Sequence, residues 1–143
     1  MTKYEKLVDA LENSDIFCLT TESTEIPAQS MHIDKDYAIF FNEAAFETEA
    51  DRFEALSHEK GHCDTGAFYK LCTPLLTKGY CERRAWRRTI LDNLPFDELM
   101  EAFDACRTYE GVTICDLADY LDLSPNFINR AIEEYIRMGK QIL

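Results

Sequence analysis

The sequence predicts an α+β fold that is predominantly helical, with a small antiparallel sheet near the N-terminus. Apolar residues recur at spacings of three and four before residue 13 and again from about residue 43 onward, a pattern typical of amphipathic helices. Between residues 16 and 41, β-branched and aromatic residues cluster around turn-forming sequence, as in short strands. A length of 143 residues with 46% apolar side chains suits one core. We therefore expect a single domain over 1–143, made of an N-terminal helix and hairpin (1–42), central helices (43–95) and a C-terminal helical part (96–143).

The first 42 residues predict a helix followed by a hairpin. Residues 2–12 carry apolar side chains at helical spacing, at Tyr4, Leu7, Val8 and Leu11. Residues 34–36 have the composition of a turn, so residues 30–33 and 37–41 are expected to pair as antiparallel strands, with 16–21 as a third strand. The histidine of this region, His32, is interpreted as structural or exposed and not as a metal ligand.

Residues 43–95 predict two helices joined by a long loop. Residues 43–63 contain no proline and carry an apolar stripe at Ala45, Phe46, Ala50, Phe53 and Leu56. Residues 64–80 contain glycine, threonine and proline, which interrupt the helical periodicity; loops of this length inside a compact domain are usually functional. A helical pattern resumes over residues 81–94 and ends before Pro95.

The C-terminal part predicts three further helices. Residues 96–111 form an amphipathic pattern that Gly111 closes. Residues 113–123 and 124–140 follow as a helix pair. Ser124 is the expected N-cap of the second helix, and Pro125 stands at its first helical position.

The charge balance disfavours a general nucleic-acid binder. The formal net charge is −12, and a field of that sign repels phosphate backbones and anionic lipid surfaces. One basic cluster interrupts the acidic sequence, formed by Arg83, Arg84, Arg87 and Arg88. We interpret it as a solvated helix face that makes ion pairs.

The sequence predicts a cytoplasmic protein with reduced thiols. Charged residues interrupt every apolar run of the first 15 residues, and elsewhere too no run is long enough to span a bilayer, so neither a signal peptide nor a membrane segment is expected. No C-x-x-C pair occurs, and the nine-residue spacing within 63–81 matches no structural zinc pattern. The cysteines are therefore expected to be mostly buried small apolar residues, at positions 18, 63, 72, 81, 106 and 115.

Residues 58–62, His-Glu-Lys-Gly-His, form an H-E-x-x-H motif at the end of the helix expected over 43–63. Residues four apart lie one above the other on a helix, so His58 and His62 can bind one ion. Glu59 is rotated by about 100° from His58, which places it at the rim of the same site. That is the position of a general base that takes a proton from a water at the metal.

A third ligand is available at Glu82. Nineteen residues separate it from His62, and Ala85 and Trp86 share its face at the start of the next expected helix. Two histidines and one glutamate leave a coordination position open, as in catalytic zinc sites. The alternative is a pair of exposed histidines on a surface helix that holds no metal. The apolar stripe of that helix and the downstream carboxylate favour the metal site, with Zn²⁺ as the expected cofactor and another divalent ion as the alternative.

The motifs resemble the ImmA/IrrE family of metallopeptidase-like proteins. The segments LSHEKGHCDTGAFY and CERRAWRRTILDNLPFDEL are similar to the family's pattern of an H-E-x-x-H helix, a T-G-x-F-Y stretch and E-x-x-A with a leucine-proline ending. The resemblance covers residues 36–139. It implies a zincin-like helical core and a zinc-dependent peptidase of the gluzincin type, with His58, His62 and Glu82 as ligands and Glu59 as the catalytic base.

The resemblance also implies a partner. In phages and other mobile elements, such proteins resemble anti-repressors that act on a partner repressor. The expected substrate is therefore a protein, namely a repressor or regulator. Binding to nucleic acid or to a membrane is not expected. Two features depart from the family pattern and bear on catalysis. Lys60 replaces a residue that is more often apolar, and it either faces solvent or perturbs Glu59; four arginines follow Glu82.

Two other functions remain open. Residues 114–136 scan like a helix-turn-helix, with Asn126, Asn129 and Arg130 on the second helix, but from Thr113 onward five acidic residues face three basic ones, a net charge of −2. The chain could also be an interaction module that keeps its metal for structure. By analogy, the N-terminal sheet could align an extended substrate beside the metal. Tyr69 or Tyr80 could donate a hydrogen bond to an oxyanion, with buried packing as the competing interpretation for both.

Overall fold

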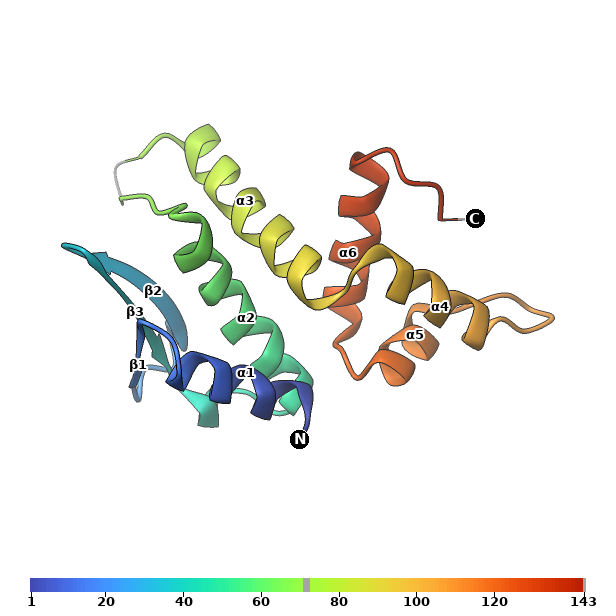
Figure 1. Ribbon diagram of the computed structural model, residues 1–143, viewed down its shortest axis with the longest axis horizontal. Coiled ribbons are helices and arrows are strands. Elements are labelled where there is room, and N and C mark those ends of the chain that lie inside the picture. Colours follow the sequence, from blue (N-terminus) through green and yellow to red (C-terminus); the bar gives the residue numbers. More distant parts are fainter. Residues whose placement is uncertain (71–72, 143) are drawn as a thin grey trace. The chain divides into compact units, whose positions relative to one another are not determined.

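The computed structural model describes residues 1–70 and 73–142 and divides into two compact units, Met1–Thr89 and Ile90–Leu143 (Figure 1). Within the described residues, six α-helices and a small N-terminal sheet confirm the predicted α+β class. The single domain over 1–143 stays a prediction. No helix in the described part of the chain combines the length and the apolar character needed to cross a membrane.

The first helix, α1 (Lys3–Glu12), has the expected bounds because its start is capped. The Thr2 hydroxyl accepts a hydrogen bond from the Glu5 amide, and the Glu5 carboxylate accepts one from the Thr2 amide. This capping box satisfies two amide groups that have no partner inside the helix. Leu7 and Leu11 are the buried residues of α1.

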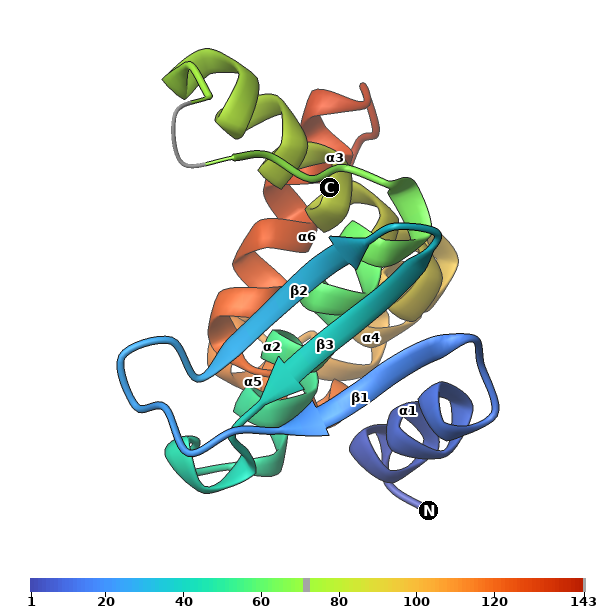
Figure 2. The same ribbon diagram turned by 90° about the vertical axis from the view of Figure 1, so that its left-hand side faces the viewer.

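The sheet contains β1 (Ile16–Thr20), β2 (Ala28–Ile33) and β3 (Asp36–Phe41), in the order β1-β3-β2 (Figure 2). β2 and β3 form the predicted antiparallel hairpin, whose turn places Asp34 in the left-handed region at φ 55°. β1 pairs with β3 in parallel, so the expectation of a purely antiparallel sheet was wrong. β3 carries the buried Ala38 and Ile39 and is the most apolar of the three strands. It takes the central position in the sheet and therefore lies between β1 and β2.

The two faces of the sheet differ. Side chains alternate along β2, so that Ser30 and His32 lie on one face while Met31 and Ile33 lie on the other. The first face packs on a helix, as Ser30 contacts a residue of α2. The second face leaves Met31 and Ile33 exposed, together with Phe17 and Leu19 of β1.

The motif helix, α2 (Glu49–Thr65), begins six residues later than expected. The Thr48 hydroxyl accepts a hydrogen bond from the Asp51 amide and thereby caps the helix. Phe46 lies outside α2 and stacks on Phe41, with 5.2 Å between the ring centroids; a short 3-10 helix, η1 (Glu43–Ala45), precedes it. The helix ends at Gly66, whose φ of 67° favours glycine.

The next helix, α3 (Leu75–Asn93), begins directly after Pro74, six residues before the expected start. The predicted loop over 64–80 is correspondingly shorter, and its residues 71–72 lie outside the described residues. Leu75 and Leu76 are 85% and 71% exposed. Because the first turns of α3 bury no apolar stripe, the periodicity of the sequence could not reveal them.

Helices α2 and α3 approach closely at Gly61. A Cβ atom at this position would lie 2.5 Å from the Ala85 carbonyl oxygen and would also overlap the Thr89 hydroxyl. That hydroxyl donates hydrogen bonds to the carbonyls of Ser57, at 3.1 Å, and of Ala85, at 2.8 Å. Glycine therefore permits a backbone contact that a larger residue would block.

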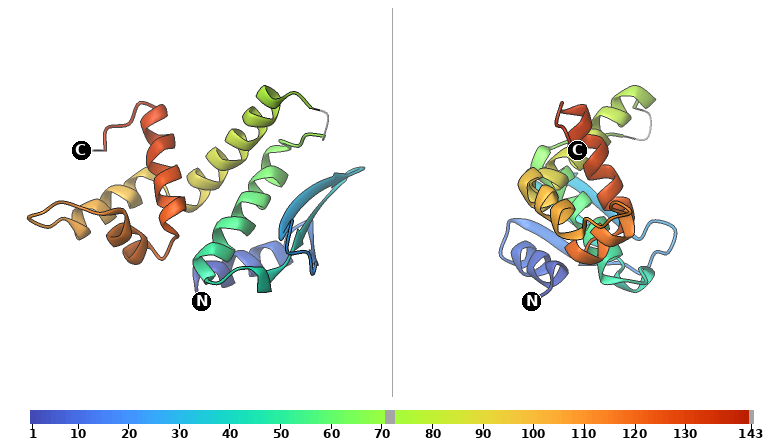
Figure 3. Two further views of the ribbon diagram at one scale, coloured as in Figure 1. Left: turned by 180° about the vertical axis from the view of Figure 1, so that it is seen from behind. Right: turned by 90° about the vertical axis from the view of Figure 1, so that its right-hand side faces the viewer.

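The second unit contains α4 (Phe96–Cys106), α5 (Ile114–Leu121) and α6 (Pro125–Arg137), drawn from yellow-orange to red in Figure 3. α4 ends before Arg107, which is extended, and not at Gly111 as expected. Thr108 and Gly111 instead form a bridge that closes a turn. The Thr108 hydroxyl reinforces it with a hydrogen bond to the Gly111 carbonyl.

The predicted helix pair is present in this unit. Asp122 follows α5 in the left-handed region at φ 54°, and Ser124 caps α6 by accepting a hydrogen bond from the Phe127 amide. The Tyr135 hydroxyl donates to the Leu94 carbonyl at 2.7 Å. The fully buried side chains of the unit include Leu94, Leu99, Leu117, Phe127, Ile128 and Tyr135.

Replacing Gly61 by alanine should separate α2 from α3 and lower the free energy of unfolding by about 1–3 kcal/mol, as overpacking does. Gly79→Ala is the matched control, because it lies in α3 with nothing within 4 Å of the added Cβ. That change should raise stability by about 0.5–1 kcal/mol through helix propensity. Urea denaturation measures both. An unchanged midpoint for Gly61→Ala would show that the close approach is not required.

Candidate metal centre

α2 places the two motif histidines on one side of the helix, one turn apart. The His58 and His62 rings meet edge to face, with centroids 4.7 Å apart. Their Nε2 atoms are 3.2 Å apart. Two imidazole nitrogens thus point to the same place, as the spacing of four predicted.

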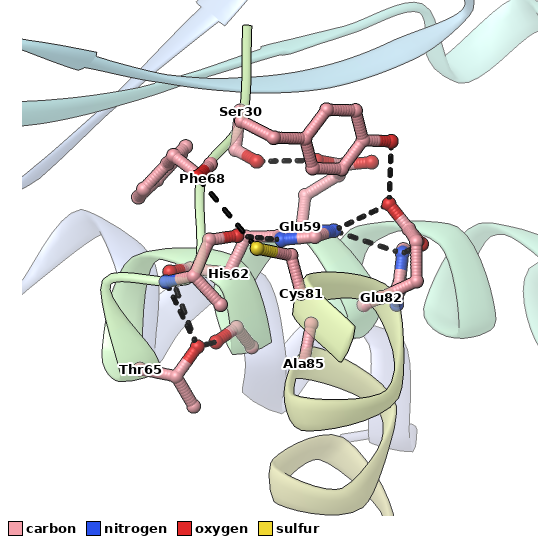
Figure 4. Close-up of polar contacts among 12 residues, drawn as sticks. Ser30, Glu59, His62, Thr65, Phe68, Cys81, Glu82 and Ala85 are labelled. Atoms are coloured by element: carbon pink, nitrogen blue, oxygen red, sulfur yellow. Dashed lines mark hydrogen bonds and ion pairs between the residues drawn. The ribbon is translucent and has the colours of Figure 1, made fainter. Parts of the chain in front are cut away.

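α3 brings the third predicted ligand to the histidines. Glu82 Oε2 lies 2.9 Å from His58 Nε2, and Glu82 Oε1 lies 3.2 Å from His62 Nε2 (Figure 4). One ligand atom from each residue lies within 4.8 Å of the others. Among the described residues this is the only group of three or more histidine, cysteine or acidic residues placed to hold a metal.

Each histidine is oriented by a different contact. His62 Nδ1 lies 2.6 Å from the Ala67 carbonyl oxygen, to which it donates, so its Nε2 is the nitrogen left for a metal. The His58 ring instead stacks on Trp86, with 4.2 Å between the centroids. Its buried Nδ1 has no hydrogen-bond partner among the described residues. Packing on the indole therefore orients His58.

The contacts within this cluster shift the pKa values of Glu82 and His62 in the absence of a metal. Hydrogen bonds from His58, then from His62 and Tyr69, hold the pKa of Glu82 well below its usual range although burial opposes this. Burial lowers the pKa of His62, but its hydrogen bonds to Glu82 and Ala67 and the nearby carboxylate charges outweigh burial and raise it. The carboxylates around His62 therefore stabilise positive charge at the place where a dication would bind.

Tyr69 contacts the ligand carboxylate. Its hydroxyl donates to Glu82 Oε1 at 2.9 Å, and this bond, followed by burial, raises the pKa of Tyr69 to about 12. Tyr69 and Tyr80 are 42% and 54% exposed, so the interpretation of buried packing was wrong for both. A donor to a ligand carboxylate fixes its orientation.

The predicted base, Glu59, contacts the sheet. Its Oε2 accepts a hydrogen bond from the Ser30 hydroxyl of β2 at 2.6 Å (Figure 4). Glu59 and Ser30 line a cavity of about 220 Å³ together with His62, Tyr69 and Glu82. Ser30 could not be predicted as a site residue, because only the packing of β2 on α2 brings it to the motif.

Lys60, which departs from the family pattern, contacts the next turn of its own helix. Its ammonium lies 2.6 Å from Asp64 Oδ2, and no ion pair between Lys60 and Glu59 occurs among the described residues. The arginines of the basic cluster are exposed as predicted. Arg84 donates a hydrogen bond to the Thr65 carbonyl at 3.2 Å. Both contacts lie at the C-terminal end of α2.

The remaining histidine, His32, is exposed, which agrees with its interpretation as structural or exposed. Its ring stacks on Tyr37, with 4.6 Å between the centroids, and is tilted against Phe68, with 5.8 Å between the centroids. Phe68 in turn lies 6.0 Å from the His62 ring. This aromatic cluster packs the segment after α2 against the sheet, close to His62.

The cysteines are less buried than expected. Cys63 is buried, and burial followed by the charge of Asp64 raises its pKa to about 12. Cys18 and Cys115 are exposed, which corrects the prediction, and Cys81 and Cys106 are intermediate. Cys72 lies outside the described residues.

Tyr69→Phe removes the donor to Glu82 and should weaken zinc binding by about 10-fold or more, as is usual for partners of metal ligands. Tyr80→Phe, an exposed tyrosine of the same helix as Glu82, is the control and should bind as the natural chain does. Competition with a chromophoric chelator measures both. Equal affinities of the two variants would contradict the role of Tyr69.

In metal-free protein, the His62–Glu82 pair should stabilise the fold most between pH 4.5 and 6.5, the ordinary pKa values of the two groups. Folding lowers the pKa of Glu82, so its contribution is present above 4.5 and lost as the pH falls. Folding raises the pKa of His62, so its contribution is present below 6.5 and lost as the pH rises through the raised value. Urea unfolding with chelator at several pH values should show a flatter profile for Glu82→Gln. An identical profile would contradict the pairing.

Comparison of the chain with known protein families, with curated proteins and with solved structures found no match.

Proposed function

We propose that the protein is a zinc-dependent peptidase of the gluzincin type, in which His58, His62 and Glu82 hold the ion and Glu59 is the base. One observation carries the proposal: three ligand atoms converge within 4.8 Å while the adjacent Glu59 lines the same cavity as His62 and Glu82. Two imidazoles and one carboxylate leave a coordination position open for chemistry. A zincin-like core is part of this proposal.

The donor set fits zinc. Imidazole nitrogen and carboxylate oxygen are ordinary zinc ligands, and His62 has its Nε2 available because Nδ1 faces the Ala67 carbonyl. Bound zinc would supply Lewis acidity, which lowers the pKa of an attacking water and polarises a carbonyl. Another divalent ion remains the alternative.

The residues of the chain divide the remaining work. Glu59 takes the proton from the attacking water and returns it to the departing amine, so that Glu59 is regenerated at the end of the reaction. Tyr69 holds the Glu82 carboxylate by its hydrogen bond to Oε1. Since Tyr69 is also part of the cavity lining, a peptide in the cavity would contact its ring.

The substrate is proposed to be a protein, and a single repressor or regulator of a phage or mobile element is the partner that the family resemblance implies. A cavity of about 220 Å³ beside the base suits a short stretch of peptide. The net charge of −12 disfavours nucleic acid as the substrate. A cytoplasmic location suits such a partner.

A second candidate function is DNA binding through α5 and α6. The helix pair is joined by a short turn with Asp122 in the left-handed region, and Asn126, Asn129 and Arg130 are exposed on α6. The charge opposes it, because residues 113–143 carry a net charge of −2. A gel-shift at stated salt concentration tests this candidate.

The peptidase is tested by incubating the zinc-loaded chain with a peptide library and identifying the products by mass spectrometry. Glu59→Gln should reduce cleavage by about 10²–10⁴-fold. It should still bind one equivalent of zinc, because Glu59 is not a ligand, whereas His62→Ala should lose the metal. Co-expression with a repressor encoded beside the gene should likewise give a defined cleavage fragment of that repressor. The fragment should be absent when the Glu59→Gln variant is co-expressed instead.

The same variant separates catalysis from a regulatory role of the metal. If Glu59→Gln retained the biological effect of the natural chain, the protein would be a metal-containing interaction module, and the peptidase assignment would be wrong. Absence of zinc from the purified natural chain after growth in zinc-supplemented medium would contradict both roles.

A further inference from the structure

We propose that Ser30 is a positioning residue that holds the Glu59 carboxylate at the metal centre. The proposal rests on the proposed function, because it gives Glu59 the role of base. Ser30 belongs to β2, while the three proposed ligands belong to α2 and α3 and Tyr69 belongs to the segment after α2. The sheet would thus contribute directly to proton transfer.

The contact is short. Ser30 Oγ donates to Glu59 Oε2 at 2.6 Å, within the usual range of an O–H···O hydrogen bond. Among the described residues, Ser30 is the only hydrogen-bond partner that the structure gives the Glu59 side chain. Lys60, the neighbouring cation, is engaged by Asp64.

The strand fixes the position of the hydroxyl. Ser30 pairs with Ile39 of β3, whose side chain is fully buried. Two residues further along the same face, His32 stacks on Tyr37 and contacts Phe68. A slip of one residue would turn Ser30 to the opposite face and expose Ile39, so the buried Ile39 and the ring contacts of His32 hold Ser30 in register.

Glu59 needs such a partner more than the ligands do. Mutual contacts fix His58, His62 and Glu82, and further contacts come from Trp86, Ala67 and Tyr69. Glu59 has a long, rotatable side chain at the wall of an open cavity. A base must stay within hydrogen-bond reach of the proton that it takes, and a displacement of about 1 Å can cost about 10²-fold in rate.

The two carboxylates of the site therefore have separate hydroxyl donors. Tyr69 holds Glu82 at 2.9 Å and Ser30 holds Glu59 at 2.6 Å. The first contact acts on a metal ligand, and the second acts on the base alone. Removing Ser30 should hence impair turnover without weakening the binding of zinc.

The test uses the zinc-loaded full chain and a peptide that it cleaves. Ser30→Ala should lower kcat by about 10–100-fold, with KM and zinc affinity changed by less than about threefold. Ser30→Thr keeps the hydroxyl and should restore most of kcat.

The effect of Ser30 should depend on Glu59. In a Glu59→Gln background, Ser30→Ala should have almost no further effect on kcat. Ser14→Ala, in the turn before β1, is the matched control and should leave kcat unchanged.

A second measurement needs no activity. In the metal-free chain, Ser30→Ala should shift the urea midpoint in the natural background more than in a Glu59→Ala background, because the second background has already lost the contact. Equal shifts in both backgrounds would overturn the contact between the two side chains.

The outcomes separate this inference from the proposed function. A chain that cleaves with a Glu59-dependent rate but is unaffected by Ser30→Ala would refute the role of Ser30 alone. A loss of zinc affinity in Ser30→Ala would make Ser30 a structural support of the ligands, which also refutes it. A natural chain that binds zinc but cleaves no peptide would refute both, whatever the urea measurement shows.

Discussion

The close approach of α2 and α3 at Gly61 determines the geometry of the His58–His62–Glu82 cluster. Both histidines lie on α2 and the carboxylate on α3, so the distance between the helices sets whether one ion can reach all three. Gly61 lies one residue before His62, and the Thr89 hydroxyl ties α3 to the Ser57 carbonyl one turn earlier on α2. The backbone contact at Gly61 thus holds α3 close enough to α2 for Glu82 to contact both histidines.

The clustering of His58, His62 and Glu82 could be predicted from the sequence because it depends on local rules. A spacing of four residues determines the relation of His58 to His62 in any helix. Glu82 could be expected because its helix continued as a periodic pattern through Ala85 and Ile90, both of which are buried. The caps at Thr2 and Ser124 are local as well, and the second of these was predicted at the right residue.

The contacts that could not be predicted depend on tertiary packing. The parallel pairing of β1 with β3 follows from the central position of β3, which no turn signal encodes. The early start of α3 leaves no trace in the periodicity because Leu75 and Leu76 face outward. Ser30 and Tyr69 reach the site from a strand and from an extended segment, at 29 and 13 residues from their partners along the chain.

The 19 residues between His62 and Glu82 have a thermodynamic consequence if zinc binds as proposed. The ion would be a cross-link between α2 and α3 and would close this segment into a ring. Closing it through a metal favours the folded chain, because the unfolded chain has no preformed site and would lose the bound ion. The stability of this acidic protein would then rise with the concentration of free zinc, and unfolding would couple directly to release of the metal.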